Sequence, residues 1–250
     1  MRRWLARLFP VGTRSVLFGA HCFFIHPWFV AAAWWRLYSF PWDPRLWVAF
    51  VVHDWGYWGK RAMDDEEGER HVELGARIMA RLFDRNLFTN QPGPEYKARH
   101  LGICFKEPDS PKWCSSDDLY RVWIGPWGCL SLLHSRFYAR KFGLQPSRLC
   151  AADKLAMALE PWWLYLPRVI ASGEIHEYMA ASRAAALGRD SVLPSKYQGE
   201  PACTTKDEVA GLSPRRAWFI VITNYCRQWA LEHADGRQDT WTPAAKQETR

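Results

Sequence analysis

The sequence lacks any C-x-x-C pair, although seven cysteines are spread over its 250 residues. Zinc ribbons depend on such pairs and disulfide frameworks use an even set of cysteines, so neither class is predicted. We expect reduced thiols and a cytoplasmic protein. The basic start MRRWLARLFP has no small-residue cleavage pattern after an apolar core, so no secretory signal peptide is predicted.

Internal repeats at solenoid periods and long low-complexity tracts are also missing. Hydrophobic residues make up 48% of the chain and charged residues 24%, which excludes collagen-like, mucin-like and wholly disordered proteins. The formal net charge of +7 suits an anionic partner, which could be a nucleotide, a nucleic acid or a membrane surface. Sixteen tryptophans predict a rigid aromatic core or the aromatic walls of a pocket.

One segment, residues 15–35, contains no Asp, Glu, Lys or Arg and has the length of a membrane span. It includes His21, His26 and Pro27, and the mean hydropathy of the whole chain is −0.31. A buried helix interrupted near Pro27 explains the segment as well, and we predict no transmembrane span.

The predicted fold class is all-α, because helical spacing of apolar residues recurs and strand-like alternation is rare. Helices are expected at 28–38, 44–54, 66–85, 129–142, 146–160, 163–171, 174–187 and 213–233. Asp43 followed by Pro44 is a typical helix start. The region 86–128 is rich in Gly, Pro, Ser and Asp, so we expect a loop with room for one short helix.

The predicted organisation is one helical domain with additions at both ends. Its parts are a basic N-terminal segment (1–19), the main domain (20–187), a linker (188–213), a C-terminal helix (214–234) and a disordered tail (235–250). Polar residues with glycine and proline indicate the linker, and the position at the chain end indicates the tail.

Histidines and carboxylates interrupt several apolar helix faces. They are His26, His53, Asp54, His71, His134 and Asp153. A carboxylate at a core position costs several kcal/mol unless it is paired or bound to metal. Any one of these histidines alone is more often a hydrogen-bonded core residue, but together they predict a shared site for a divalent metal such as Mn, Fe, Co, Ni or Zn.

The order of these residues resembles a known family. His26, then His53-Asp54 in VAFVVHDWGYWG, then Asp153 in LCAADKLAMAL are similar to the hallmark of the HD-domain superfamily of metal-dependent phosphohydrolases. ERHVELGARIM around His71 and LLHSRFYARKFG around His134 resemble the segments that carry extra histidines in members with two metals. The resemblance covers roughly residues 20–170 and implies an HD-type helical bundle, here with a C-terminal helical extension.

The resemblance also implies roles for individual residues. His26, His53, Asp54 and Asp153 would be the primary ligands of a divalent metal (Mn, Fe, Co, Ni, Zn or Mg). His71 and His134 would bind a second ion, with Asp54 bridging the two, if there are two. A metal-bound water of lowered pKa would then attack phosphorus.

Three cations are expected near the phosphate, namely Lys60, Arg136 and Lys154. For Lys60 and Arg136 the alternative is a solvated surface charge. His21 competes with His26 as first ligand, and His26 is preferred because apolar residues continue a helical face after it. His100, in the predicted loop, is a further ligand candidate. The acidic pair of nucleotidase members is absent from HDWGYWGK, which argues against nucleoside 5′-monophosphatase activity.

The predicted function is hydrolysis of a phosphate ester or anhydride in a small anionic substrate, a nucleotide above all. One alternative is a di-iron oxygenase, which some members of the fold are. Another is a non-catalytic, metal-stabilised module that binds nucleic acid or membrane. Nucleic acid is less favoured because the basic residues are scattered and no recognised binding motif occurs.

Overall fold

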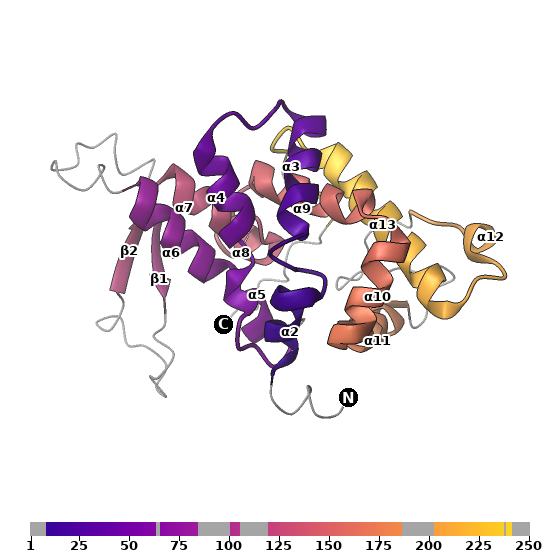
Figure 1. Cartoon of the computed structure of the whole chain (residues 1–250). Coiled ribbons are helices and arrows are strands. Elements are labelled where there is room, and N and C mark those ends of the chain that lie inside the picture. Colours follow the sequence, from indigo (N-terminus) through magenta and orange to yellow (C-terminus); the bar gives the residue numbers. More distant parts are fainter. Residues whose placement is uncertain are drawn as a thin grey trace, which may run out of the picture.

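Helices form most of the computed structural model, which describes residues 9–63, 66–84, 101–105, 120–186, 203–237 and 239–241. They are α2 (Val11–Phe18), α3 (His26–Leu37), α4 (Pro44–Val52), the 3-10 helix η1 (Trp55–Tyr57), α5 (Glu66–Glu69), α6 (Val72–Phe83), α7 (Pro126–Leu132), α8 (Arg136–Lys141), α9 (Arg148–Leu159), α10 (Trp162–Ser172), α11 (Glu174–Ala186), α12 (Lys206–Val209) and α13 (Pro214–His233). Figure 1 shows this arrangement. The fold class is all-α, as predicted.

The main core lies where α9 packs against both α3 and α13 (Figure 1). Val30, Phe50, Leu149 and Trp229 are among its side chains and are at most 1% exposed. Burying one such side chain contributes about 1.5–3 kcal/mol to folding. A second close pair, α6 and α7, packs beside this core.

Local sequence signals mark several helix ends correctly. The Asp43 side chain accepts a hydrogen bond from the Arg45 N–H, and Pro44 is the first residue of α4. At the end of α10, Gly173 adopts a left-handed conformation with φ 93°, which glycine tolerates without steric cost.

Two predicted helices are each divided in the structure. The expected helix 66–85 is α5 and α6, with Arg70 and His71 between them, and the expected helix 129–142 is α7 and α8. The Ser135 side chain caps α8 by accepting from two backbone N–H groups, which ends the preceding helical path. His71 and His134 therefore lie at breaks between helices rather than within helices.

The region 86–128 was predicted to be a loop with room for one short helix. Where the structure describes this region before α7, it forms two strands, so the prediction is wrong there. Strands β1 (Leu101–Phe105) and β2 (Tyr120–Ile124) pair antiparallel, with Leu101 opposite Ile124 and Phe105 opposite Tyr120. Five residues are too few for a clear alternating signal among turn-forming neighbours. His100 lies outside the described residues.

The C-terminal helix is part of the core rather than an extension of it, since Trp229 of α13 is 1% exposed. The prediction of a disordered tail from residue 235 onward is also wrong for the described residues of that segment. Asp239 forms an ion pair with Arg136, and Trp241 is 6% exposed and donates from its indole nitrogen to Glu232. These long-range contacts leave no local periodic pattern.

The structure describes part of the predicted N-terminal segment (1–19) and part of the predicted linker (188–213). Within 1–19, helix α2 is largely buried and contacts α10 and η1, so this part belongs to the domain. Of the expected linker, 203–213 is described and includes α12, which begins with a capping box between Thr205 and Glu208. The rest of the linker, 188–202, lies outside the described residues.

The charge-free segment is shared between two helices. Its first part belongs to α2, which ends at Phe18, and its last part belongs to α3, which begins at His26 and has Pro27 as its second residue. The break therefore precedes Pro27. Among the described helices, none is both long enough and apolar enough to cross a bilayer.

Candidate metal centre

Six side chains from separate parts of the fold meet in one buried cluster. They are His26 at the start of α3, His53 and Asp54 after α4, His71 before α6, His134 between α7 and α8, and Asp153 in α9. These are the six metal ligands predicted from the sequence, and the structure brings all of them together.

The first group comprises His26, His53, Asp54 and Asp153. The Nε2 atom of His26 lies 2.9 Å from Asp153 Oδ1 and 3.5 Å from Asp54 Oδ2. The Nε2 atom of His53 lies 3.0 Å from Asp54 Oδ2 and 3.7 Å from Asp153 Oδ1. All four ligand atoms are within 4.8 Å of one another, so a single ion could be shared among them.

The second group comprises Asp54, His71 and His134. Asp54 Oδ1 lies 3.6 Å from Nε2 of His71 and 3.4 Å from Nε2 of His134, and these two nitrogens are 3.2 Å apart. Asp54 therefore offers Oδ2 to the first group and Oδ1 to the second.

Backbone carbonyls orient three of the imidazole rings. The Nδ1 atoms of His53, His71 and His134 lie 3.0, 2.7 and 2.5 Å from the carbonyl oxygens of Phe50, Gly68 and Ser131. A carbonyl oxygen only accepts, so each Nδ1 carries the hydrogen, and in a neutral ring the Nε2 lone pair points into the cluster. Metal-binding histidines are commonly held in this way.

This donor arrangement fits a divalent metal. Neutral His71 and His134 would direct lone pairs at each other across 3.2 Å, which is repulsive without a cation or proton between them. In addition, no hydrogen bond of acceptable geometry reaches His53 Nε2 or Asp54 Oδ2, although these two buried atoms lie 3.0 Å apart. Imidazole with carboxylate oxygen suits Mn, Fe, Co, Ni and Zn.

The histidines of the cluster differ in pKa. Burial, followed by the neighbouring His134, lowers the pKa of His71 to about 3. Burial also lowers the pKa of His53, but Asp54 and Asp153 outweigh it and raise that pKa to about 10. Burial opposes ionisation of Asp54 as well, yet His53 and other histidines hold its pKa well below the usual value. Burial likewise opposes ionisation of Asp153, but hydrogen bonds with His26 and His53 hold its pKa well below the usual value. Asp54 and Asp153 therefore both stay ionised.

Close backbone packing supports both groups. A Cβ at Gly56 would lie 1.8 Å from the carbonyl oxygen of His71, and one at Gly75 would lie 2.9 Å from the His53 Cα. The Tyr57 ring stacks on the His71 ring with centroids 3.9 Å apart. The roles of Gly56, Gly75 and Tyr57 were not predicted from the sequence, where the local signal was limited to the glycines that follow the His53-Asp54 doublet.

Helices α6 and α7 are fastened by a buried carboxylate. Asp84, 1% exposed at the end of α6, accepts hydrogen bonds from the backbone N–H groups of Trp127 and Gly128 at the start of α7. A carboxylate is favourable at a helix N-terminus. This contact joins the end of α6, the helix that follows His71, to the start of α7, the helix that precedes His134.

The predicted cations lie in different surroundings. Arg136 is 7% exposed, pairs with Asp239 at 2.6 Å and donates to the Tyr225 hydroxyl. It is therefore not a solvated surface charge, and its buried ion pair argues against a role in holding phosphate. Lys60 Nζ lies 3.6 Å from Glu67. Lys154 follows Asp153 in α9, with Nζ 5.6 Å from the centroid of the Trp229 ring.

Of the two candidates for first ligand, the structure groups His26 with the other predicted ligands. Among the described residues, His26 belongs to the first group, whereas His21 belongs to neither. His21 Nδ1 lies 2.7 Å from Ser15 Oγ. Burial lowers the pKa of His21 although nearby carboxylates oppose this.

Comparison with family models, curated proteins and solved structures finds no match. Support for a function comes therefore from the side chains described above and from the resemblance of their sequence pattern.

Proposed function

We propose that the protein is an HD-type, metal-dependent phosphohydrolase that cleaves a phosphate ester or anhydride, with a nucleotide as substrate. The observation that carries the proposal is the position of Asp54, whose two oxygens face two separate groups of histidines. A shared carboxylate of this kind suits two ions held close together, an arrangement common in phosphoryl-transfer enzymes.

Each ligand has a distinct task in this proposal. His26, His53 and Asp153 would hold one ion, His71 and His134 the other, and Asp54 both. When bound, the metals would supply a water of lowered pKa and would offset negative charge on the phosphoryl oxygens. The carbonyl contacts of the histidine Nδ1 atoms keep the rings in place.

Asp153 indicates the side from which a substrate would approach. Its side chain is 26% exposed, whereas the other five ligand side chains are at most 8% exposed. Lys154 follows Asp153 in the sequence and would supply a cation for an anionic substrate. The aromatic residues Trp55 and Trp58, which follow the doublet, are 37% and 56% exposed, and such rings suit stacking on a nucleobase.

Product analysis tests the proposal. Purified protein is incubated with a panel of nucleotides and Mn²⁺, and the products are separated by chromatography. We expect loss of at least one nucleotide, and no loss with Asp54→Asn. The matched control is Asp207→Asn, a similar change at an exposed position on α12. Turnover that persists unchanged in Asp54→Asn would contradict the proposal.

A di-iron oxygenase is the second candidate. It is favoured by the completeness of the six-residue set of four histidines and two carboxylates, because iron also binds such ligands. Iron content measured together with oxygen consumption distinguishes it from the hydrolase. For the non-catalytic module, salt-dependent nucleic-acid binding that survives Asp54→Asn is the corresponding observation.

A further inference from the structure

A row of exposed aromatic side chains follows α3 and the loop that leads to α4. It consists of Phe24, Trp28, Trp35, Phe40 and Trp42, which are 68%, 65%, 61%, 37% and 82% exposed. We refer to these five residues as the aromatic edge. The metal centre does not account for these exposed residues, nor does the core.

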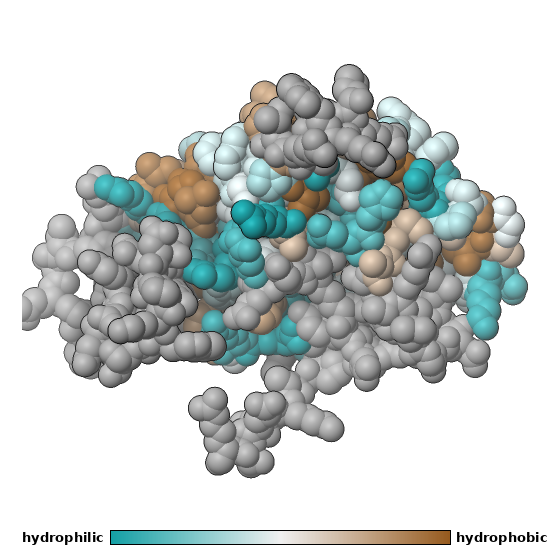
Figure 2. All heavy atoms as spheres, turned by 90° about the horizontal axis from the view of Figure 1, so that it is seen from below, coloured by the Kyte–Doolittle hydropathy of each residue, from teal (hydrophilic) through white to brown (hydrophobic). Residues whose placement is uncertain are grey.

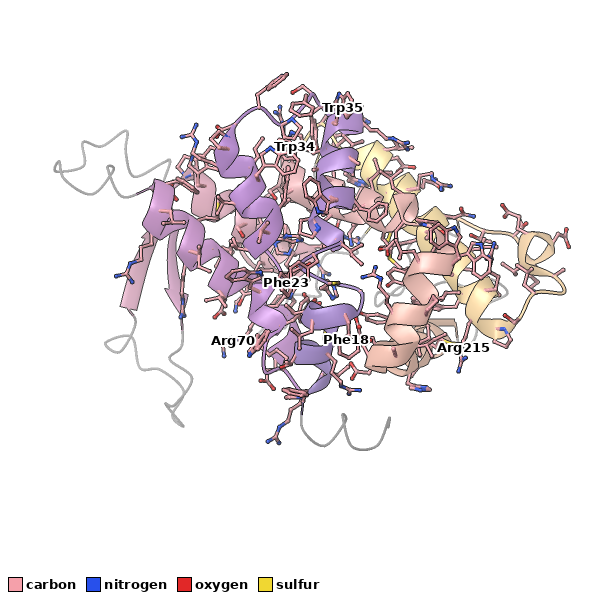
Figure 3. The ribbon with its side chains drawn as sticks, in the orientation of Figure 1. Phe18, Phe23, Trp34, Trp35, Arg70 and Arg215 are labelled. Atoms are coloured by element: carbon pink, nitrogen blue, oxygen red, sulfur yellow. The ribbon has the colours of Figure 1, made fainter. Side chains whose placement is uncertain are left out.

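The aromatic edge is continuous along one side of α3. A spacing of seven residues places Trp28 and Trp35 on the same side of α3, and Phe24 lies in the turn just before this helix. The Trp35 ring lies 5.5 Å from Phe40, whose ring lies 4.4 Å from Trp42. The core takes the other side of α3, since Trp34 is only 7% exposed. Figure 3 labels Trp34 and Trp35 at the end of α3 that leads toward α4.

The composition of the aromatic edge suits a lipid interface. It consists of tryptophan and phenylalanine, whose rings favour the boundary between water and acyl chains. A contiguous exposed patch of this kind marks an interaction surface. On the opposite side of the molecule, viewed from below in Figure 2, the described residues mix hydrophilic and hydrophobic types.

Positive charge outweighs negative charge around the aromatic edge. Arg36, exposed beside Trp35 on α3, is the only charged residue between positions 15 and 42 of the sequence. The first acidic residue, Asp43, is 2.7 Å from Arg45. The guanidinium carbon of Arg148 lies 5.2 Å from the centroid of the Tyr38 ring, and the nearby Asp235 carries the opposite charge. Cations beside interfacial aromatics favour anionic lipid.

We propose that the aromatic edge docks the protein onto the surface of an anionic phospholipid membrane. The protein would lie on the membrane, with the aromatic rings at headgroup depth and the exposed Arg36 and Arg148 near lipid phosphates. This inference does not depend on the proposed function, because no metal ligand belongs to the aromatic edge.

Co-sedimentation with vesicles tests the inference. Full-length protein is mixed with vesicles of phosphatidylcholine alone or with phosphatidylglycerol added. We expect binding to the anionic vesicles, weaker binding to phosphatidylcholine, and a blue shift of tryptophan fluorescence on binding. The double variant Trp35→Ala/Trp42→Ala should bind the anionic vesicles at least about tenfold more weakly, whereas Trp35→Tyr/Trp42→Tyr should recover most of the binding.

The matched control is Trp163→Ala, because Trp163 on α10 is 62% exposed and lies outside the aromatic edge. Its vesicle binding should equal that of the unaltered protein. The inference is overturned if neither vesicle binds the protein, or if Trp163→Ala weakens binding as much as the double alanine variant. It is equally overturned if light scattering without lipid shows a dimer that the double alanine variant abolishes.

Discussion

Two buried carboxylates in this protein have opposite surroundings. Glu174, at the start of α11, is 0% exposed and accepts hydrogen bonds from four groups of the protein. These are the hydroxyls of Ser15, Ser172 and Tyr178 and the backbone N–H of Ala20. Its charge is therefore offset by hydrogen bonds from within the fold.

Asp54, 5% exposed, has no hydroxyl or amide donor among its described contacts. It faces imidazole nitrogens of His26, His53, His71 and His134. A buried carboxylate costs several kcal/mol unless its charge is compensated. The difference teaches that Glu174 is complete as a structural group, whereas the residues around Asp54 are grouped so that they could hold a metal ion.

The largest effect is expected from a substitution of Asp54. Asp54→Asn removes the carboxylate shared by both groups, so bound metal should fall to near zero and hydrolysis by about a thousandfold. Metal analysis by plasma mass spectrometry and the nucleotide assay measure these losses. Retention of the full metal content by the variant would contradict the ligand assignment.

The second effect concerns Glu174. Glu174→Gln places an amide among donors that suited a carboxylate, so the free energy of unfolding should fall by about 2 kcal/mol. Metal content per folded protein should stay unchanged. Urea denaturation of the metal-loaded protein measures the first quantity and metal analysis the second. If metal is lost as well, the two carboxylates do not belong to independent sites.

The smallest expected effect is the change of metal affinity with pH. The pKa of His53 is raised to about 10 without metal, and a metal ligand must be neutral, so metal displaces a proton there. Metal affinity should therefore rise about tenfold per pH unit from neutrality toward pH 10. In the metal-free protein the same proton stabilises the fold below the ordinary pKa of 6.5, and this stabilisation is lost as pH rises through about 10.

Competition with a coloured metal indicator at several pH values measures that slope. The control is His176→Gln, because His176 is exposed on α11, and the slope should not change. A flat dependence between pH 7 and 9 (roughly a hundredfold less change than one displaced proton requires) would contradict the assignment of the proton.

Much of the candidate site was predictable because its signals are local. A histidine or aspartate within an apolar helical pattern is visible in a few residues, and the six residues predicted as ligands are the six that meet. Helix starts such as Asp43-Pro44 are equally local, since the cap bonds only to its own helix.

The partners of Glu174 were not predictable. Ser15 and Ala20 precede it by 159 and 154 residues, and no periodic pattern links such distant positions. For the same reason the pairing of β1 with β2 and the burial of Asp239 and Trp241 were missed. Contacts of this kind form only after distant segments have packed.

By itself, the sequence determined the helical class, the caps and the six polar residues on apolar faces, because each depends on neighbours within a turn or two. Only the tertiary structure decided that Asp54 directs its two oxygens to different histidines, that His26 and not His21 completes the first group, and that Arg136 is held by Asp239. These outcomes depend on how separate helices pack, and packing is set by the whole core at once.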